Sequence, residues 1–225
     1  MAITHPFLIA LMNVGEVTSA VSRGLSERSK TVKLDIQYAQ KKAALRRGVK
    51  EELTGEFVMH FRTISVIGGS DSDQKVLMLA EQVGEEIAKR NVALVCGGLG
   101  GVMEAACRGA KKHNGLTVGI LPTDTKEHAN EFVDIVIPTG IGYARNFLVA
   151  KAGDAVIAMD GSAGTLSEIA IAWFSDRPII SVTSSGGWAE KLAGTQIDGR
   201  RNDKVHSAKT PKEAVDMVFK ALNWQ

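Results

Sequence analysis

Residues 153–168 read GDAVIAMDGSAGTLSE and contain a complete transition from a strand to a helix. The apolar run Ala155–Met159 has no alternating polar positions, which is typical of a strand that is buried on both faces of a sheet. The run ends at an acidic, glycine-rich turn, and a helix is predicted from Leu166 onward. A buried strand that leads through a tight turn into a helix is the repeating unit of a parallel α/β sheet.

The same alternation of strand-length and helix-length segments extends from Thr63 through the rest of the chain. The expected strands are Ile64–Ile67, Val92–Val95, Thr117–Leu121, Asp134–Ile137, Ala155–Met159 and Ile179–Val182. The expected helices are Asp73–Arg90, Val102–His113, Ala144–Ala152, Leu166–Phe174, Trp188–Leu192 and Pro211–Leu222. Because crossovers between parallel strands are right-handed, these units predict an α/β fold. It is a Rossmann-like, doubly wound parallel sheet with helices on both faces.

Residues 1–62 lack this periodic pattern and are predicted to form a basic N-terminal extension, flexible or helical, with a charged helix over Lys33–Leu53. Residues 63–225 are predicted to form a Rossmann-like nucleotide-binding domain. The first 60 residues carry nine Lys and Arg against six Asp and Glu, so the basic excess lies in the extension. The remaining chain is slightly acidic, which argues against nucleic acid as a partner of the core.

The overall composition indicates a soluble globular protein, with 44% hydrophobic and 23% charged residues. The early apolar run Phe7–Met12 is far too short to span a bilayer, so no membrane partner is expected. A cytoplasmic location is expected, and organellar import stays open if residues 1–50 are a transit segment. Cys96 and Cys107 do not form a CxxC motif and the five His show no ligand spacing, so reduced thiols and no metal site are expected.

The predicted binding site lies beyond the carboxyl ends of the strands, where open parallel sheets bind ligands. Glycine-rich turns follow several strands there. The candidate ligand-binding residues are Gly69, Ser70, Gly97, Gly98, Gly100, Gly101, Thr139, Gly140, Gly161, Ser162, Ala163, Gly164 and Thr165. Glycine allows close approach of a ligand, and a helix N-terminus offers free N–H groups to an anion. Together these turns predict a site for a phosphate-containing small molecule, a nucleotide or a pterin, although a single such turn is explained equally well by turn geometry.

Two common kinds of nucleotide-binding site do not match the sequences of these turns. The first turn reads GGSDSD instead of GxGxxG, and the second strand ends in Cys96-Gly97-Gly98 instead of an acidic residue, which disfavours an NAD(P) dehydrogenase. The chain also lacks GxxxxGK[ST], so it has no P-loop.

Glu168 has two possible roles. Thr165-Leu166-Ser167-Glu168 fits a capping box, in which the Glu side chain reaches back to the start of the helix. The same carboxylate is expected at the ligand rim, where Arg145 begins the preceding helix. An Arg and a Glu facing one pocket can bind phosphate, orient a water molecule or stabilise an oxocarbenium ion. The residues leave both interpretations open, whereas Asp154 is expected to be a structural turn acid.

The segments Gly97–Ala105 (GGLGGVMEA), Arg145 and Gly164–Glu168 (GTLSE) resemble the Lonely Guy (LOG) superfamily, often labelled putative lysine decarboxylases. Characterised LOG enzymes are phosphoribohydrolases that release ribose 5-phosphate from cytokinin riboside monophosphates and sometimes from AMP. The resemblance implies Arg145 and Glu168 as the catalytic pair and the turns Gly97–Gly101 and Gly161–Thr165 as phosphate cradles. The decarboxylase label has no support, because the chain shows no pyridoxal-phosphate lysine motif.

A subgroup is a closer match over residues 63–185. Val118–Pro122, Pro138–Gly140, Ala144–Asn146 and Gly164–Ala170 are similar to the DprA/Smf-related family 1, which molybdenum cofactor carrier proteins resemble. Two features depart from the LOG pattern. Asp160-Gly161-Ser162 replaces Pro-Gly-Gly, and Asn146 stands where Lys usually follows the Arg. A carboxylate beside a phosphate cradle would repel phosphate unless it is paired or points away.

The resemblance implies a protein that binds a nucleotide or phosphorylated cofactor, such as a molybdenum cofactor carrier with a molybdopterin-type cofactor as its ligand. The alternative is a phosphoribohydrolase that cleaves the N-glycosidic bond of nucleoside 5′-monophosphates, with Glu168 assisting water attack and Arg145 holding the substrate. A homodimer or higher homo-oligomer is also expected. The apolar segment Ile169–Phe174 could supply its interface or could simply pack on the sheet.

Overall fold

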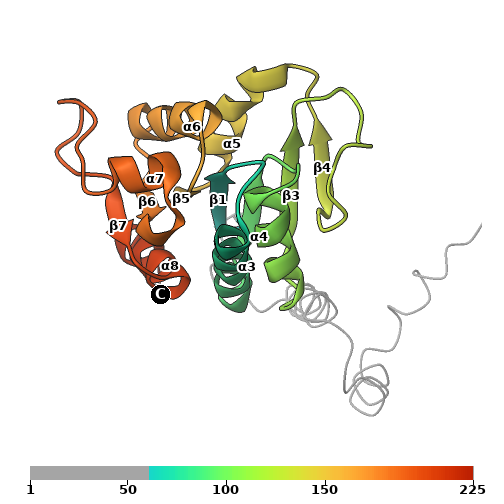
Figure 1. Cartoon of the computed structure of the whole chain (residues 1–225), viewed down its shortest axis with the longest axis horizontal. Coiled ribbons are helices and arrows are strands. Elements are labelled where there is room, and N and C mark those ends of the chain that lie inside the picture. The colour runs from blue at the N-terminus through green and yellow to red at the C-terminus, as the bar shows by residue number, and fades with distance from the viewer. Residues whose placement is uncertain (1–60, 225) are drawn as a thin grey trace, which may run out of the picture. The chain divides into compact units, whose positions relative to one another are not determined.

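The computed structural model describes residues 61–224, in which seven parallel strands form one sheet (Figure 1). The order across the sheet is β4-β3-β2-β1-β5-β6-β7. The strands are β1 (Thr63–Gly68), β2 (Ala93–Cys96), β3 (Thr117–Leu121), β4 (Ile135–Pro138), β5 (Ala155–Met159), β6 (Ile179–Val182) and β7 (His206–Ala208). The expected Rossmann-like α/β fold is therefore confirmed.

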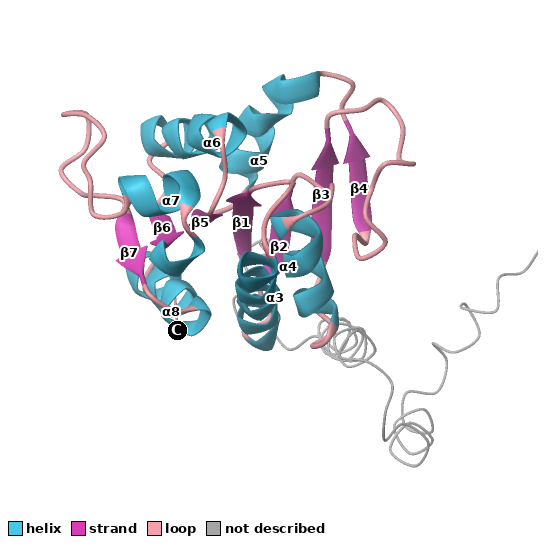
Figure 2. Cartoon of the chain, in the orientation of Figure 1, coloured by secondary structure: helices cyan, strands magenta, loops and turns pink. Residues whose placement is uncertain are grey.

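Helices cover both sides of this sheet (Figure 2). They are α3 (Gln74–Lys89), α4 (Val102–Lys111), α5 (Asn146–Ala152), α6 (Ala163–Phe174), α7 (Gly187–Leu192) and α8 (Pro211–Ala221), with 3₁₀ turns η2 (Gly142–Arg145) and η3 (Thr183–Ser185). Side chains of a strand alternate between its two faces. In β1, Ile64 and Val66 join the core formed with α3, α4 and α8, and Ile67 joins the core formed with α5, α6 and α7. This two-sided burial explains why the strands read as continuous apolar runs.

The strand order reverses between β1 and β5. From β1 the chain proceeds outward through β2, β3 and β4, then returns through η2 and α5 to place β5 on the other side of β1. A reversal of this kind opens a crevice at the carboxyl ends of the flanking strands. The topology therefore places the predicted binding site beyond β1, β2 and β5.

Most predicted elements agree with the structure to within a few residues, and two differences matter. The short edge strand β7 was not predicted, and α6 begins at Ala163 instead of Leu166. Asp154 is confirmed as a structural acid, because its Oδ2 accepts hydrogen bonds from the backbone N and Oγ1 of Thr63 at 2.9 and 3.1 Å. The predicted extension lies outside the described residues as far as residue 60, including its Lys33–Leu53 helix.

The segment Ile169–Phe174 mainly packs against the sheet. Ile169, Ala172 and Trp173 are buried in the core, whereas Phe174 is 44% exposed and lies 6.3 Å from the ring of Phe147. Ordinary packing thus explains most of this segment, and the predicted oligomer stays a prediction. In the described part of the chain, no helix is long and apolar enough to cross a membrane.

Candidate functional site

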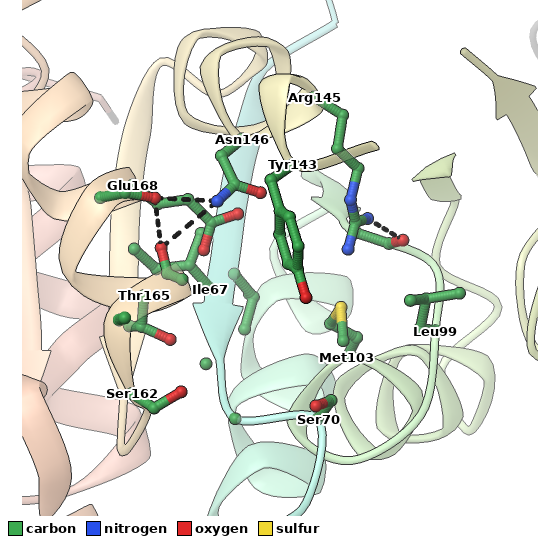
Figure 3. A pocket seen from close by; sticks show the side chains of 17 residues that line it. Ile67, Ser70, Leu99, Met103, Tyr143, Arg145, Asn146, Ser162, Thr165 and Glu168 are labelled. Carbon is green, nitrogen blue, oxygen red and sulfur yellow. Dashed lines mark hydrogen bonds between the residues drawn. The ribbon is translucent and has the colours of Figure 1, made fainter. Parts of the chain in front are cut away.

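A cavity of about 580 Å³ opens at the carboxyl ends of the central strands. Its walls come from the end of β1, the β2–α4 turn, η2 and the first turns of α5 and α6 (Figure 3). The lining residues are Val66, Ile67, Gly68, Gly69, Ser70, Gly97, Leu99, Met103, Tyr143, Arg145, Asn146, Ser162, Ala163, Gly164, Thr165, Ser167 and Glu168. The cavity therefore occupies the crevice that the strand reversal predicts.

The structure brings many of the predicted site residues together in this lining and leaves others out. Gly69, Ser70, Gly97, Arg145, Ser162, Ala163, Gly164, Thr165 and Glu168 line the cavity. Gly98, Gly100, Gly101, Thr139, Gly140 and Gly161 are absent from the lining. The sequence places all of these residues at the correct edge of the sheet, but it does not indicate which of them line the cavity.

Backbone geometry and packing explain three of the glycines that lie outside the lining. Gly98 and Gly101 adopt positive φ values of +70° and +66°, which side chains rarely tolerate. A Cβ at Gly101 would lie 2.4 Å from the carbonyl oxygen of Gly69, and a Cβ at Gly161 would lie 2.1 Å from Oγ1 of Thr165. These positions need glycine to let neighbouring turns approach each other.

The Thr139–Gly140 turn is held by the strand beside it. Thr139 Oγ1 donates to the carbonyl oxygen of Leu121 at 2.6 Å, and the N–H of Gly140 donates to that of Thr123 at 2.9 Å. These donors are therefore used within the fold.

The start of α6 presents free backbone donors to the cavity. Ser162 is the N-cap, and its side chain makes no capping hydrogen bond. Within residues 61–224, the N–H groups of Ala163, Gly164 and Thr165 have no hydrogen-bond acceptor, and all three residues line the cavity. Free N–H groups and the positive end of the helix dipole favour an anion at this position.

The predicted capping box is wrong. The first hydrogen bond of α6 runs from the N–H of Leu166 to the carbonyl oxygen of Ser162, so the helix starts before Thr165. The chain can enter the helix this early because Gly161, with φ +92°, turns it sharply. Glu168 consequently lies inside the helix and cannot reach back to its N-terminus. Of the two interpretations of Glu168, the cap is excluded.

Glu168 is a buried carboxyl group that faces the cavity. Its exposed fraction is 8%, and no hydrogen bond to its carboxyl group is present in residues 61–224. Burial raises the pKa of Glu168 to about 7, and the opposing attraction of the Arg145 charge is the smaller effect. A carboxyl group of this kind changes its protonation near neutral pH, which suits proton transfer.

Arg145 is anchored by the sheet. Its Nη1 donates hydrogen bonds to the carbonyl oxygens of Gly97 and Ile120, at the ends of β2 and β3. Burial lowers the pKa of Arg145 and the charge of Glu168 raises it. No ion pair joins these two side chains in the described structure, and they lie on opposite sides of the cavity with Tyr143 between them (Figure 3). Arg145 thus places a fixed positive charge at the cavity wall.

The two departures from the LOG pattern have structural explanations. Asp160 does not line the cavity, and its Oδ2 accepts a hydrogen bond from Oγ of Ser72 at 2.6 Å. Asn146 donates from Nδ2 to Oγ of Ser167 at 2.8 Å, and Ser167 donates to the carbonyl oxygen of Gly164 at 2.6 Å. The extra carboxylate is therefore paired away from the cavity, and Asn146 fixes the first turn of α6.

Sequence reasoning missed the apolar part of the site. Leu99, Met103 and Tyr143 line the cavity, although none of them was among the predicted site residues, and only Leu99 lies in a glycine-rich turn. The signal that could have found Tyr143 is its position two residues before Arg145 in a chain with only two Tyr. Cys96, which ends β2 beside the site, is buried with its Sγ 3.5 Å from that of Cys107, and both are free thiols. No group of His, Cys, Asp and Glu suited to a metal ion occurs in the described region.

Comparison with known proteins finds relatives by sequence and by structure. The model of the SLOG cluster4 family matches residues 61–215. An uncharacterised protein of Archaeoglobus fulgidus is 44% identical over 55% of this chain and 82% of its own length. A cytokinin riboside 5′-monophosphate phosphoribohydrolase of Mycobacterium tuberculosis is 33% identical over 61% of this chain and 76% of its own. The solved molybdenum cofactor binding protein of Rippkaea orientalis is 33% identical, with a TM-score of 0.65 over 73% of this chain and 99% of that chain.

Proposed function

The chain belongs to the SLOG cluster4 family, within the LOG superfamily that its motifs resemble, and on this premise we propose that its cavity binds a phosphorylated planar heterocycle. The proposed role is that of a carrier, with a molybdopterin-type cofactor or a nucleotide as the ligand. The similarity to a molybdenum cofactor binding protein supports this class of ligand.

The observation that carries the proposal is the unoccupied set of backbone donors at the start of α6. Ala163, Gly164 and Thr165 direct N–H groups to the cavity lining at the positive end of a 12-residue helix. By contrast, α3 is capped by Asp73, whose Oδ1 accepts from the N–H of Val76 at 2.8 Å. A phosphate group would supply to α6 the acceptors that Asp73 supplies to α3.

The test removes one of these donors without disturbing the helix. Ala163 is the first helical residue, where proline is tolerated and where the preceding Ser162 is already extended, with φ −109° and ψ −151°. We expect Ala163→Pro to weaken binding of AMP and of a pterin monophosphate about tenfold, which is the effect of losing one charge-assisted hydrogen bond. Isothermal titration calorimetry measures both affinities.

A matched control is available in α3. Gln74 is also the first residue of its helix, follows an extended N-cap and lies outside the cavity lining. Gln74→Pro should bind both ligands as wild type does. Equal affinities of Ala163→Pro and wild type would refute the phosphate site at α6.

A second candidate function, hydrolysis of nucleoside 5′-monophosphates, is favoured by Glu168. A buried carboxyl group without a hydrogen bond, with a pKa of about 7, is suited to act as a general base. In this reaction the Glu168 carboxylate takes a proton from water, and the resulting hydroxide bonds to the sugar C1′ as the N-glycosidic bond breaks. The leaving base takes up a proton from solvent, so the products are free base and ribose 5-phosphate. The fixed charge of Arg145 holds the substrate.

Release of free base from a panel of nucleoside 5′-monophosphates separates the two candidates. If the protein is a hydrolase, Glu168→Gln should lower kcat by about 10²–10³-fold and leave ligand affinity in place. Glu104→Gln is the control, because Glu104 lies in the first turn of α4 outside the cavity lining. Absence of release by wild type from every member of the panel would leave the carrier role alone.

A further inference from the structure

Tyr143 is the most exposed of the large hydrophobic side chains in residues 61–224, at 88%, and it lines the cavity. An aromatic ring left in water at the edge of a site indicates a contact that the isolated chain does not satisfy. Figure 3 shows the ring extending from η2 into the cavity, with its hydroxyl end toward Met103 and Ser70.

The backbone that carries Tyr143 is held on both sides. The N–H of Gly142 donates to the carbonyl oxygen of Pro122 at 3.0 Å, and the N–H of Ala144 donates to that of Ile141 at 3.2 Å. Two residues later, Arg145 is tied to the ends of β2 and β3. The fold thus holds the backbone at Tyr143 while leaving the faces of its ring uncovered.

One side of the cavity carries backbone donors and a carboxyl group, and the opposite side combines apolar side chains with the charge of Arg145. The donors of Ala163–Thr165 lie on the α6 side, together with Glu168, whereas Leu99 and Met103 form an apolar wall on the α4 side (Figure 3). A planar ring fits between an aromatic face and a Met thioether, because both present polarizable apolar surface. Stacking of this kind accepts many ring systems, since every heteroaromatic base has a π face.

We propose that Tyr143 is the residue that selects ligands with a planar heteroaromatic ring, by stacking on that ring against the wall formed by Leu99 and Met103. The inference rests on the proposed function, because it assigns the phosphate to α6 and the ring to Tyr143. It names the chemical class that the cavity distinguishes: heterocycle-bearing phosphates over simple sugar phosphates.

Three probes test the proposal in the full chain: AMP, a pterin monophosphate and ribose 5-phosphate, which has no heterocycle. Calorimetric titration of Tyr143→Ala should show about tenfold weaker binding of each ring-bearing probe that wild type binds, the effect of losing one stacked aromatic. Binding of ribose 5-phosphate should stay unchanged. Tyr143→Phe, which keeps the ring and loses the hydroxyl, should bind as wild type does.

The outcomes separate this inference from the proposed function. If wild type binds no ring-bearing probe, the proposed function and this inference both fall. If wild type binds one and Tyr143→Ala binds it equally well, or loses ribose 5-phosphate to the same extent, the ring-selecting role alone is refuted. Sedimentation velocity supplies a further check. Ile141, which directly precedes η2, and Phe147 and Leu148 of α5 are also exposed, so a changed sedimentation coefficient of Tyr143→Ala would assign the ring to contact with a second copy instead.

Discussion

The two long glycine-rich turns at the carboxyl edge of the sheet look alike in sequence and differ in what their backbones contact. The β2–α4 turn, Gly97–Gly101, is filled by its neighbours. The N–H of Val102 at the start of α4 donates to the carbonyl oxygen of Gly69 at 2.9 Å, and a Cβ at Gly101 would meet the same oxygen. Gly101 therefore serves contact between turns.

The β5–α6 turn, Gly161–Gly164, is open. The N–H groups of Ala163, Gly164 and Thr165 have no acceptor in the described chain, and a Cβ at Gly164 would meet no atom within 4 Å. Glycine content therefore predicts that a turn is tight but does not predict that it binds a ligand. What differs between these two turns is the space around their glycines, which neighbouring backbone fills at Gly101 and leaves empty at Gly164.

The largest effect is expected from a substitution in the β2–α4 turn, where Gly101 is packed against neighbouring backbone. Gly101 has φ +66° and ψ −133°, a conformation that other residues avoid, and a Cβ there would clash with backbone atoms of Gly69 and Ser70. We expect Gly101→Ala to lower the free energy of unfolding by about 3 kcal/mol or more, from strain and the clash together. Urea denaturation followed by circular dichroism measures the change.

Gly100→Ala is the matched control for this variant. A Cβ at Gly100 would make only ordinary contacts, 3.7 Å from Oε2 of Glu104 and 3.9 Å from the oxygen of Ser70. It should stay within about 0.5 kcal/mol of wild type. If Gly101→Ala lowers the free energy of unfolding only slightly, the turn can rearrange to accept a side chain. The proposed structural difference between the two turns would then be wrong.

The next effect concerns the carboxyl groups on the helices that follow the two turns. Glu104 of α4 is partly exposed and lies 3.9 Å from Arg108, whereas Glu168 of α6 is buried without a hydrogen bond. The folded protein raises the pKa of Glu168 from 4.5 to about 7, so it favours the protonated form. Ionising Glu168 therefore costs more in the folded state than in the unfolded state. This cost is absent below pH 4.5, the pKa in the unfolded state, and it grows as pH rises from 4.5 to 7. Above pH 7 the free energy of unfolding has lost the full amount.

Glu168→Gln should remove this pH dependence. Relative to wild type, the variant should gain about 2.5 kcal/mol of unfolding free energy between pH 5 and pH 8. Comparing the two proteins cancels the other titrating groups. A constant difference across this range would mean that Glu168 ionises normally and that the α6 side of the cavity is more polar than its contacts indicate.

The central strands could be predicted from sequence because each is buried on both faces and leaves an unbroken apolar run. The run Ala155–Met159 is fully buried and was placed to the residue. The strand β7 (His206–Ala208) could not be found, because it is a short edge strand with polar residues and only Ala208 buried. Hydrophobic periodicity carries no signal for such a strand.

The site was predictable in position and not in detail. Arg145 and Glu168 were both expected at the rim, and both line the cavity. The start of α6 was misplaced because Ser162-Ala163-Gly164 contains weak helix formers. Its early start also depends on the positive φ of Gly161, which cannot be read from the amino-acid sequence. Which glycines touch the cavity depends on contacts between turns far apart in sequence, such as Gly69 with Gly101.

The smallest effect is expected from a substitution in the open β5–α6 turn. Gly164 lies in the first turn of α6 with free space where its Cβ would be, so Gly164→Ala should raise the free energy of unfolding by about 0.5 kcal/mol through helix propensity. The same methyl group would enter the cavity beside the free N–H groups and should weaken binding of ribose 5-phosphate severalfold. Ala163→Gly, which removes a methyl group from the same turn, should lower stability by a similar amount and retain ligand binding. If Gly164→Ala is stabilised and binds the sugar phosphate as tightly as wild type, the phosphate does not reach α6. The free N–H groups of the open turn then bind only water.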